Sequence, residues 1–227
     1  MLILALESSA KPGSCALVSG GELLGQYFQN SGLTHSRTLL SMTQSLLKNL
    51  DITVSDVDLI AVSRGPGSFT GVRIGVSAAK GIAWGADKPV CGVSTLEAMV
   101  YQIPQPGAVI CPVMDARRGQ VYNALFEWKD ENAIRLSDDR AISLDELAAD
   151  LKKIKTPSLL VGDGAAIAYE YLKASGLQCR VAPHLMRWQT AYGVALAALN
   201  AKPIPAIELE PSYLRPSQAE RAMGVGS

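Results

Sequence analysis

A glycine-rich run over residues 65–75 has the composition of a loop that binds phosphate groups. A P-loop ends in Gly-Lys-Ser/Thr, because the lysine reaches the phosphates and the hydroxyl binds magnesium. In this sequence Gly71 is followed by Val72 and Arg73, so both groups are missing. A dinucleotide-binding fingerprint fails as well, because Thr70 stands where the third glycine of that motif belongs. The spacing therefore argues against nucleotide binding at this loop.

The elements around the run give its residues a simpler explanation. The apolar segment 59–63 predicts a strand, and the spacing of apolar residues over 69–85 predicts a helix. Pro66-Gly67 is typical of a turn, and Ser68 is well placed to cap the following helix. We therefore interpret the run as a turn followed by a capped helix.

The helix predicted over 69–85 has two apolar faces. Its polar stripe consists of Thr70, Arg73, Ser77, Lys80 and Trp84. One apolar face has ordinary core residues, namely Val72, Val76, Ala79 and Ala83. The other face has unusually small residues, namely Gly71, Ile74, Gly75, Ala78, Gly81 and Ile82. Glycine costs about 1 kcal/mol relative to alanine within a helix, so its density here suggests clearance for a partner helix. A single large core that covers both faces is the alternative.

The helix predicted over 34–50 also has too much apolar surface for one core. Its leucines and its methionine cover more of the circumference than the stripe of about 100° that one core requires. Exposed apolar patches of this kind usually mark partner sites. We therefore expect a partner interface on the two helices, formed by Leu39, Met42, Leu46, Gly71, Ile74, Gly75, Ala78 and Ile82.

Residues that could carry catalysis are sparse. The two histidines, His35 and His184, lie far apart, and Leu39 stands where a metal-binding pair would place a histidine four residues after His35. The sequence has no G-x-S-x-G nucleophile elbow. No position combines a base, a nucleophile and an orienting group, so we predict no catalytic residue and no metal ligand. His35 is better interpreted as a capping or packing residue.

Three turns are weak candidates for binding a nucleotide or another anion. One follows the predicted strand 2–8, one lies between predicted strands at 115–119, and one opens the predicted helix 164–174. Their residues are Ser8, Ser9, Arg117, Arg118, Gly162 and Gly164. Turn formation and helix capping explain these positions as well. We therefore expect no cofactor to be bound by this chain alone.

The composition narrows the class of protein. The chain has 227 residues, is 48% hydrophobic, and balances 21 basic against 21 acidic residues. Such a balance gives no reason to expect nucleic acid or an anionic membrane as a direct partner. The start of the chain lacks the features of a signal peptide, and no apolar stretch approaches the length of a membrane span. Four widely spaced cysteines predict buried reduced thiols in a cytoplasmic protein.

The predicted elements occur in the same order twice. The first half predicts strands at 2–8, 14–19, 22–29, 58–63 and 89–93, with helices at 34–50, 69–85 and 95–102. The second half predicts strands at 108–114, 120–128, 133–136 and 158–162, with helices at 143–153, 164–174 and 189–201. We predict an α/β fold of two tandem βββαβα lobes, the second reduced. The N-terminal lobe covers 1–103, and the C-terminal lobe covers 104–227 with a proline-rich tail able to pack back on the first.

Several motifs resemble the signature of the bacterial TsaB (YeaZ) family. The most specific is the run 65–75 together with Ala79-Lys80-Gly81. Further matching segments follow the same order, namely His35-Ser36 with Leu39-Leu40, residues 93–98, residues 114–122 and residues 211–215. The resemblance covers nearly the whole chain.

The resemblance implies a fold and a role. The fold is that of actin, sugar kinases and Hsp70 (ASKHA). The role is that of a non-catalytic subunit in the synthesis of threonylcarbamoyladenosine in tRNA. The implied partners are the catalytic paralogue TsaD, bound through helices 34–50 and 69–85, and the ATPase TsaE. The complex transfers the threonylcarbamoyl group from its adenylate to the adenosine beside the anticodon, so tRNA is reached only through the complex.

Other expectations accompany the resemblance. We expect a homodimer in isolation. Whether ATP or ADP binds at an interface shared within the complex stays open. Two residues depart from the family pattern, namely Arg37 and Glu7. Two alternatives remain: a stand-alone ATPase or small-molecule kinase of the same fold, and a glycoprotease-like peptidase that acts on its partner. The missing histidine pair argues against the peptidase.

Overall fold

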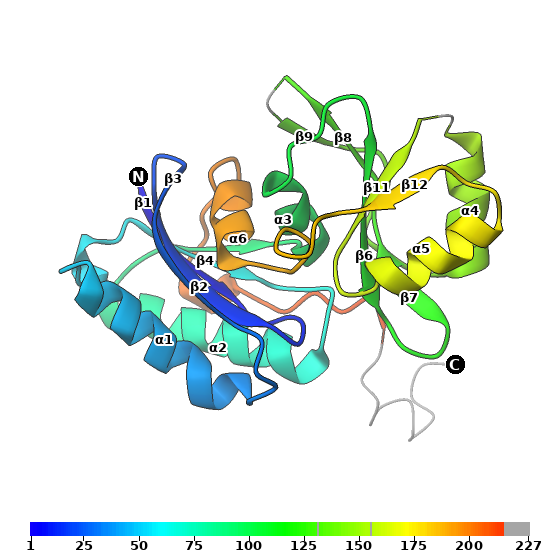
Figure 1. Ribbon diagram of the computed structural model, residues 1–227. Coiled ribbons are helices and arrows are strands. Elements are labelled where there is room, and N and C mark those ends of the chain that lie inside the picture. Colours follow the sequence, from blue (N-terminus) through cyan, green and yellow to red (C-terminus); the bar gives the residue numbers. More distant parts are fainter. Residues whose placement is uncertain (131, 155, 216–227) are drawn as a thin grey trace.

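The computed structural model describes residues 1–130, 132–154 and 156–215. Two lobes lie side by side, each built around its own β-sheet (Figure 1). Among the described residues, no helix combines the length and apolar character needed to cross a membrane.

The first sheet has the strand order β3-β2-β1-β4-β5. Strand β1 pairs antiparallel with β2 and parallel with β4, and β4 continues in parallel to β5. The bounds are β1 Leu2–Glu7, β2 Gly13–Ser19, β3 Glu22–Gln29, β4 Leu59–Ser63 and β5 Val90–Val93. Strands β1 and β4 are apolar up to their last residues, Glu7 and Ser63, because helices cover both faces of the sheet.

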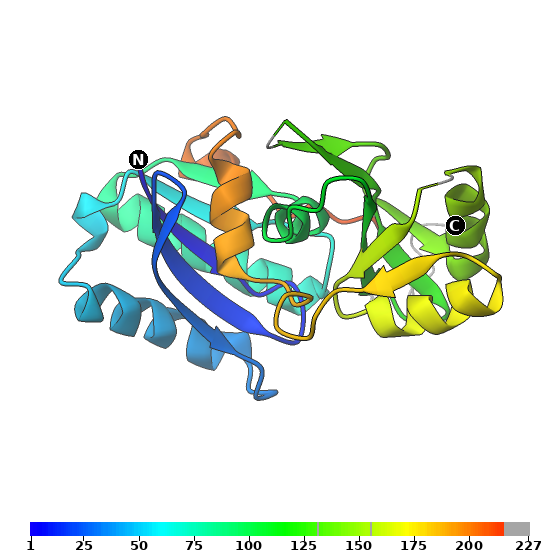
Figure 2. The same ribbon diagram turned by 45° about the horizontal axis from the view of Figure 1, so that its top comes forward.

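Different helices cover the two faces of this sheet (Figure 2). Helices α1 (His35–Asn49) and α2 (Phe69–Ala86) pack on one face, against a core that includes Leu4 and Leu17. Helix α6 (Ala191–Ala198) packs on the opposite face, beside α3 (Thr95–Tyr101). A short 3-10 helix, η1 (Val54–Asp56), precedes β4.

The second sheet follows the order β10-β7-β6-β11-β12, and β8 pairs with β6 on one side and with β9 on the other. The antiparallel β6–β7 pair and the parallel β6–β11 pair repeat the β1–β2 and β1–β4 pairs of the first lobe. Helices α4 (Leu144–Lys153) and α5 (Ala165–Ala174) pack on this sheet. The strands are β6 Val109–Asp115, β7 Gln120–Asn123, β8 Phe126–Lys129, β9 Asn132–Arg135, β10 Arg140–Ser143, β11 Ser158–Val161 and β12 Cys179–Val181. The predicted duplicated α/β fold is confirmed.

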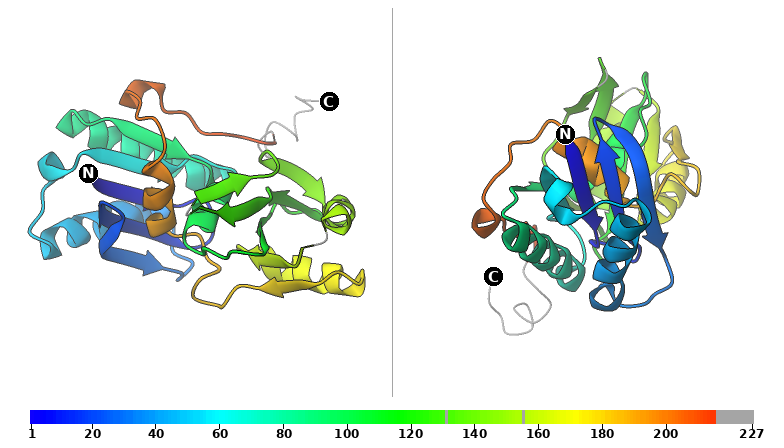
Figure 3. Two further views of the ribbon diagram at one scale, coloured as in Figure 1. Left: turned by 90° about the horizontal axis from the view of Figure 1, so that it is seen from above. Right: turned by 90° about the vertical axis from the view of Figure 1, so that its left-hand side faces the viewer.

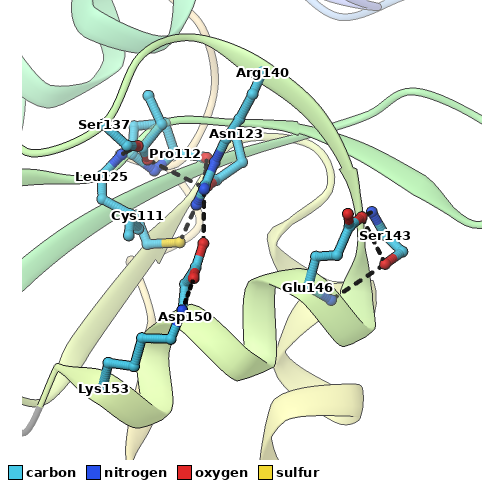
Figure 4. A network of polar contacts seen from close by, with 11 residues as sticks. Cys111, Pro112, Asn123, Leu125, Ser137, Arg140, Ser143, Glu146, Asp150 and Lys153 are labelled. Carbon is cyan, nitrogen blue, oxygen red and sulfur yellow. Dashed lines mark hydrogen bonds and ion pairs between the residues drawn. The ribbon is translucent and has the colours of Figure 1, made fainter.

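One predicted strand was wrong in an informative way. The segment 120–128 is two strands, because the chain leaves β7 after Asn123 and pairs again only from Phe126, along β6 and β9. The buried Asn123 amide donates to the carbonyl oxygens of Pro112 and Ala124, at 2.8 and 3.1 Å, and so satisfies the backbone at this break (Figure 4).

A polar network ties the break to helix α4 (Figure 4). Arg140 donates to the Asn123 side-chain oxygen at 3.2 Å and to Asp150 at 2.6 Å. Ser143 and Glu146 form a capping box at the start of α4. Strands β10 and β12 are only four and three residues long, and their pairing was not visible in the sequence pattern.

The chain returns to the first lobe after completing the second sheet. Helix α6 is apolar on nearly every side, and such a helix is stable only when buried. Ile204 then pairs with Val90, and Leu209 enters the core between α2 and the first sheet. Residues 191–209 thus pack with the first lobe, whereas the sequence-based division assigned helix 189–201 to the second.

The segment 203–215, named here the C-terminal strap, runs along the first lobe toward the second (Figure 3, left). It contains the 3-10 helix η2 (Ala206–Glu208). Lys80 holds it to α2 by donating to the carbonyl oxygens of Ile207 and Leu209, both at 3.1 Å. Arg215 then donates to the Ala116 carbonyl oxygen in the second lobe at 3.0 Å.

Candidate functional site

A cleft of about 560 Å³ lies between the two lobes. Its walls come from the turn after β1, the start of α2, the turn after β6, Asp163 in the turn after β11, and the strap. The lining residues include Ser9, Lys11, Gly67, Ser68, Phe69, Thr70, Asp115, Arg117, Tyr122, Asp163, Tyr213 and Arg215. Residues 66–70 of the glycine-rich run therefore form part of a cleft wall.

The turn after β1 places its polar residues in different environments. Ser8 is buried and donates its hydroxyl to the Gly71 carbonyl oxygen at 2.9 Å, so it faces α2 and does not line the cleft. Ser9 lines the cleft, and its buried hydroxyl has no hydrogen-bond partner among the residues that the structure describes. Glu7 is fully buried, and that burial raises the pKa of its carboxyl above the ordinary value. Its Oε1 accepts the Ser9 amide at 2.5 Å.

The two arginines of the turn after β6 also lie in different places. Arg117 and Arg118 both have left-handed backbone angles, with φ of 62° and 57°. Asp115 steadies the turn by accepting the Arg117 amide at 2.7 Å. Arg117 lines the cleft and Arg118 is exposed beside it, so only the first is placed to bind a molecule there.

The Gly162-Asp163-Gly164 turn has a structural explanation for its glycines. A Cβ atom at Gly162 would collide with the Val113 carbonyl oxygen, and one at Gly164 would crowd the Asp115 amide at 3.0 Å. Asp163 between them lines the cleft and accepts a hydrogen bond from Gln189 at 2.8 Å. Burial raises the pKa of the Asp163 carboxyl.

The cleft thus contains only part of the predicted anion-binding set. Ser9 and Arg117 come together there, whereas Ser8, Gly162 and Gly164 face the protein interior. The prediction omitted Lys11, Asp163 and Arg215. Asp163 was within reach of sequence reasoning because it stands between two glycines already chosen, but no local signal brings Arg215 to this cleft. Basic and acidic side chains share the site, and the basic ones suit an anionic group.

The glycines of the run 65–75 correct our main interpretation of the sequence. A Cβ atom at Gly71 would collide with the Ser8 carbonyl oxygen, and one at Gly75 would collide with Ser8 Oγ. Gly65 has a φ of 118° and lies against the Ser212 backbone. These glycines therefore let segments of the same chain approach, and the expected clearance for a partner helix at Gly71 and Gly75 is wrong.

Two predicted local roles can be compared with the structure. Ser68 caps α2 as predicted, by accepting the Gly71 amide at 3.3 Å. His35 packs on the turn after β1, with its Nε2 2.8 Å from the Ala10 carbonyl oxygen. Across residues 1–130, 132–154 and 156–215, the His, Cys, Asp and Glu side chains form no group of three or more suited to a metal ion.

The two helices predicted to bind a partner form a shallow, mostly apolar groove. Its lining includes His35, Ser36, Leu39, Leu40, Phe69, Thr70, Arg73, Ile74, Ser77 and Ala78, and we call it the α1–α2 groove. Leu40 is 52% exposed there, although the predicted interface omitted it. Nearby, Gly81 has open space where a side chain would point, and Trp84 is 76% exposed.

Part of the predicted interface belongs to the core instead. Leu39 and Leu46 are 1% and 2% exposed and pack against the first sheet, so they offer a partner almost no surface, although Leu39 borders the groove. Met42, Ile74, Ala78 and Ile82 are half-buried at the edge of the same core. The helical wheel gave the width of the apolar surface, but not which part of it the protein itself covers.

The two-lobed architecture has clear structural relatives. The activator of the 2-hydroxyisocaproyl-CoA dehydratase from Clostridium difficile, solved with bound ADPNP, superposes with a TM-score of 0.51 at 12% identity. The match covers 88% of this chain and 95% of that one. The fold is therefore of the class shared by actin, sugar kinases and Hsp70.

Closer similarities narrow this class to a family. A Pseudomonas aeruginosa protein with similarity to the peptidase YeaZ superposes with a TM-score of 0.79 at 24% identity, covering 94% of this chain and 99% of that one. The family model of TsaD, the tRNA N6-adenosine threonylcarbamoyltransferase, matches residues 29–222. The tRNA threonylcarbamoyladenosine biosynthesis protein TsaB of Bacillus subtilis is 31% identical, over 97% of this chain and 96% of that protein. The chain belongs to the TsaB (YeaZ) family, within the group that the TsaD model describes.

Proposed function

We propose that this chain is a non-catalytic subunit of the machinery that makes threonylcarbamoyladenosine in tRNA. It pairs with a TsaD-type transferase and activates it, and the ATPase TsaE joins the assembly. The transferase moves the threonylcarbamoyl group from its adenylate to tRNA. This chain reaches the tRNA only through that complex. The family membership supports the pathway, and the α1–α2 groove supports the pairing.

The exposure of apolar side chains on α1 and α2 is the observation that carries this proposal. Leu40 and Trp84 are large and exposed on these helices, and the apolar residues Ile74 and Ala78 line the groove beside Leu40. A paralogue of the same fold has two corresponding helices, and packing the two pairs together buries both apolar surfaces. The formal net charge of zero is consistent with a protein partner rather than with direct tRNA binding.

Reconstitution tests the role directly. The transferase of the same organism is combined with TsaE, tRNA and a source of threonylcarbamoyl-adenylate, with and without this chain, and the modified nucleoside is measured by mass spectrometry. We expect modification to require this chain while the chain alone modifies nothing. Equal modification in its absence would refute the proposal.

The residues that line the cleft give a reason to test one alternative function, namely that of a stand-alone ATPase or small-molecule kinase. Lys11, Arg117 and Arg215 line a cleft in a fold whose relative was solved with bound ADPNP. Calorimetry of the purified chain with ATP and magnesium distinguishes the two functions. We expect no saturable micromolar binding by the chain alone, and such binding would favour the alternative.

A further inference from the structure

Three side chains form a cluster at the start of α2. Arg73 donates from Nε to the Tyr213 hydroxyl at 2.8 Å, and its guanidinium carbon lies 3.9 Å from the centre of the Phe69 ring. The Phe69 and Tyr213 rings stack, with centroids 4.7 Å apart and an interplanar angle of 27°. We call these three residues the Arg73 clasp, and it holds the C-terminal strap to α2 at a point 140 residues away in sequence.

The clasp lies where the two candidate surfaces meet. Phe69 and Arg73 line the α1–α2 groove. Phe69 and Tyr213 line the cleft between the lobes. Tyr213 does not line the groove, but its side chain contacts Phe69 and Arg73, which do.

The strap is held at both ends, and the clasp together with one backbone hydrogen bond holds its middle. At its N-terminal end, Leu209 is 1% exposed in the core, and Lys80 binds the neighbouring carbonyl groups. At the other end, Arg215 reaches the second lobe at Ala116. Between them, Tyr213 is 41% exposed and is held by Arg73 and Phe69, while the Ser212 amide donates to the Arg64 carbonyl oxygen at 2.6 Å.

We propose that Tyr213 and Arg73 are positioning residues for the partner surface. The clasp fixes the Phe69 and Arg73 side chains at the end of the α1–α2 groove and, through Tyr213, the strap along the cleft. Occupation of the groove and ordering of the strap are therefore coupled. This inference rests on the proposed pairing with a TsaD-type transferase.

The coupling is reciprocal by thermodynamic necessity, so it gives two measurements. If the ordered strap holds Arg73 and Phe69 in position at the groove, a substitution that disorders the strap weakens partner binding. If a partner fixes Arg73 and Phe69, its binding must protect the strap by the same free energy. Neither effect is expected from a tail that only covers the sheet.

Tyr213→Ala is the decisive variant, because Tyr213 does not itself line the groove. We expect its affinity for the transferase to fall at least about fivefold, the lower end of typical coupling. Tyr213→Phe keeps the ring stack but loses the hydrogen bond with Arg73, so its affinity should fall less. Tyr169→Ala is the matched control, since Tyr169 lies on α5 in the second lobe, and it should bind as the wild type does.

Hydrogen exchange at the Ser212 amide supplies the second measurement. In the isolated chain, Tyr213→Ala should accelerate this exchange, and in the wild type the transferase should slow it. Wild-type binding with unchanged Tyr213→Ala affinity would overturn the coupling while leaving the proposed function intact. Unchanged Ser212 exchange in Tyr213→Ala would overturn the clasp itself. Failure of the wild-type chain to bind the transferase would instead refute the pairing and the coupling together.

Discussion

The backbone of Gly75 lies so close to the side chain of Ser8 that a Cβ atom at position 75 would collide with Ser8 Oγ. The same atom would lie 3.3 Å from Cγ2 of Val62, on strand β4 of the first sheet. Ser8 is fixed in turn by its hydrogen bond to the Gly71 carbonyl oxygen. Helix α2 therefore contacts the end of β1 through backbone, and this contact sets the position of the α1–α2 groove.

Substitution of the two kinds of helix glycine should have opposite effects. Gly75→Ala forces Ser8 to move, so we expect a loss of about 1–3 kcal/mol in unfolding free energy. Gly81→Ala is the matched control, because nothing lies within 4 Å of the new methyl group. The helix preference for alanine should then stabilise the chain by up to about 1 kcal/mol. Urea denaturation measures both values, and equal effects would contradict this account.

The isolated chain should form a homodimer through the α1–α2 groove, because burial of the exposed apolar side chains favours self-association when no partner is present. Leu40→Glu places a charge on this surface and should yield a monomer with unchanged helix content. Light scattering at high protein concentration measures the mass. A monomeric wild type, or a dimer that tolerates Leu40→Glu, would be the opposite result.

Glu7 should make stability decrease as pH rises. Burial raises the pKa of its carboxyl in the folded chain above the ordinary value of 4.5. Between the pKa of the unfolded chain and the higher pKa of the folded chain, the folded chain retains a proton that the unfolded chain has lost. The free energy of unfolding therefore falls as pH rises through this range. Glu7→Gln removes this ionisation, so its melting temperature should exceed that of the wild type by a margin that grows as pH rises from about 4.5.

Glu146 provides a control of opposite sign for the pH experiment. Its hydrogen bonds with Ser143 lower the pKa of its carboxyl. That contribution to stability is present above the ordinary pKa and is lost on acidification. Glu146→Gln should therefore melt below the wild type at neutral pH, with a difference that shrinks in acid. A constant difference between Glu7→Gln and the wild type at every pH would contradict the assignment to Glu7.

The four free cysteines should differ in reactivity. Burial raises the pKa of Cys111 to about 12 and that of Cys15 and Cys91 to about 11. Burial raises the pKa of Cys179 as well, but this cysteine is only half-buried and therefore accessible to a reagent. Since the thiolate is the reactive form, a thiol reagent at pH 8 should modify Cys179 first and the other three only after unfolding. Cys179→Ala should abolish the fast phase, and a fast phase that survives would disprove this order.

Local patterns in the sequence predicted much of the first lobe. Strands β1 and β4 are apolar on both sides because two helical layers cover them, and Ser68 caps α2 through a contact only three residues away. Short strands such as β12 carry too few residues for a pattern, and their pairing depends on distant neighbours. The packing of α6 on the first sheet likewise depends on long-range contacts between apolar surfaces, and no local sequence signal encodes it.

The candidate site was predictable only in part, for the same physical reason. The helical wheel of α2 identified its small face, but the residue that covers Gly75 is Ser8, in the turn after β1 and far away in sequence. Arg73 and Lys80 were identified as a polar stripe, and the structure shows that both hold the strap. Which surface remains free for a partner depends on these long-range contacts.

The most direct test of the proposed pairing is the affinity of this chain for the transferase when the α1–α2 groove is altered. Leu40→Glu changes an exposed groove residue, and Leu185→Glu changes a leucine that is 88% exposed between β12 and α6. We predict that the wild type and Leu185→Glu co-elute with the transferase in size-exclusion chromatography, while Leu40→Glu elutes alone with an unchanged melting temperature. Co-elution of all three proteins would contradict the α1–α2 groove as the partner surface.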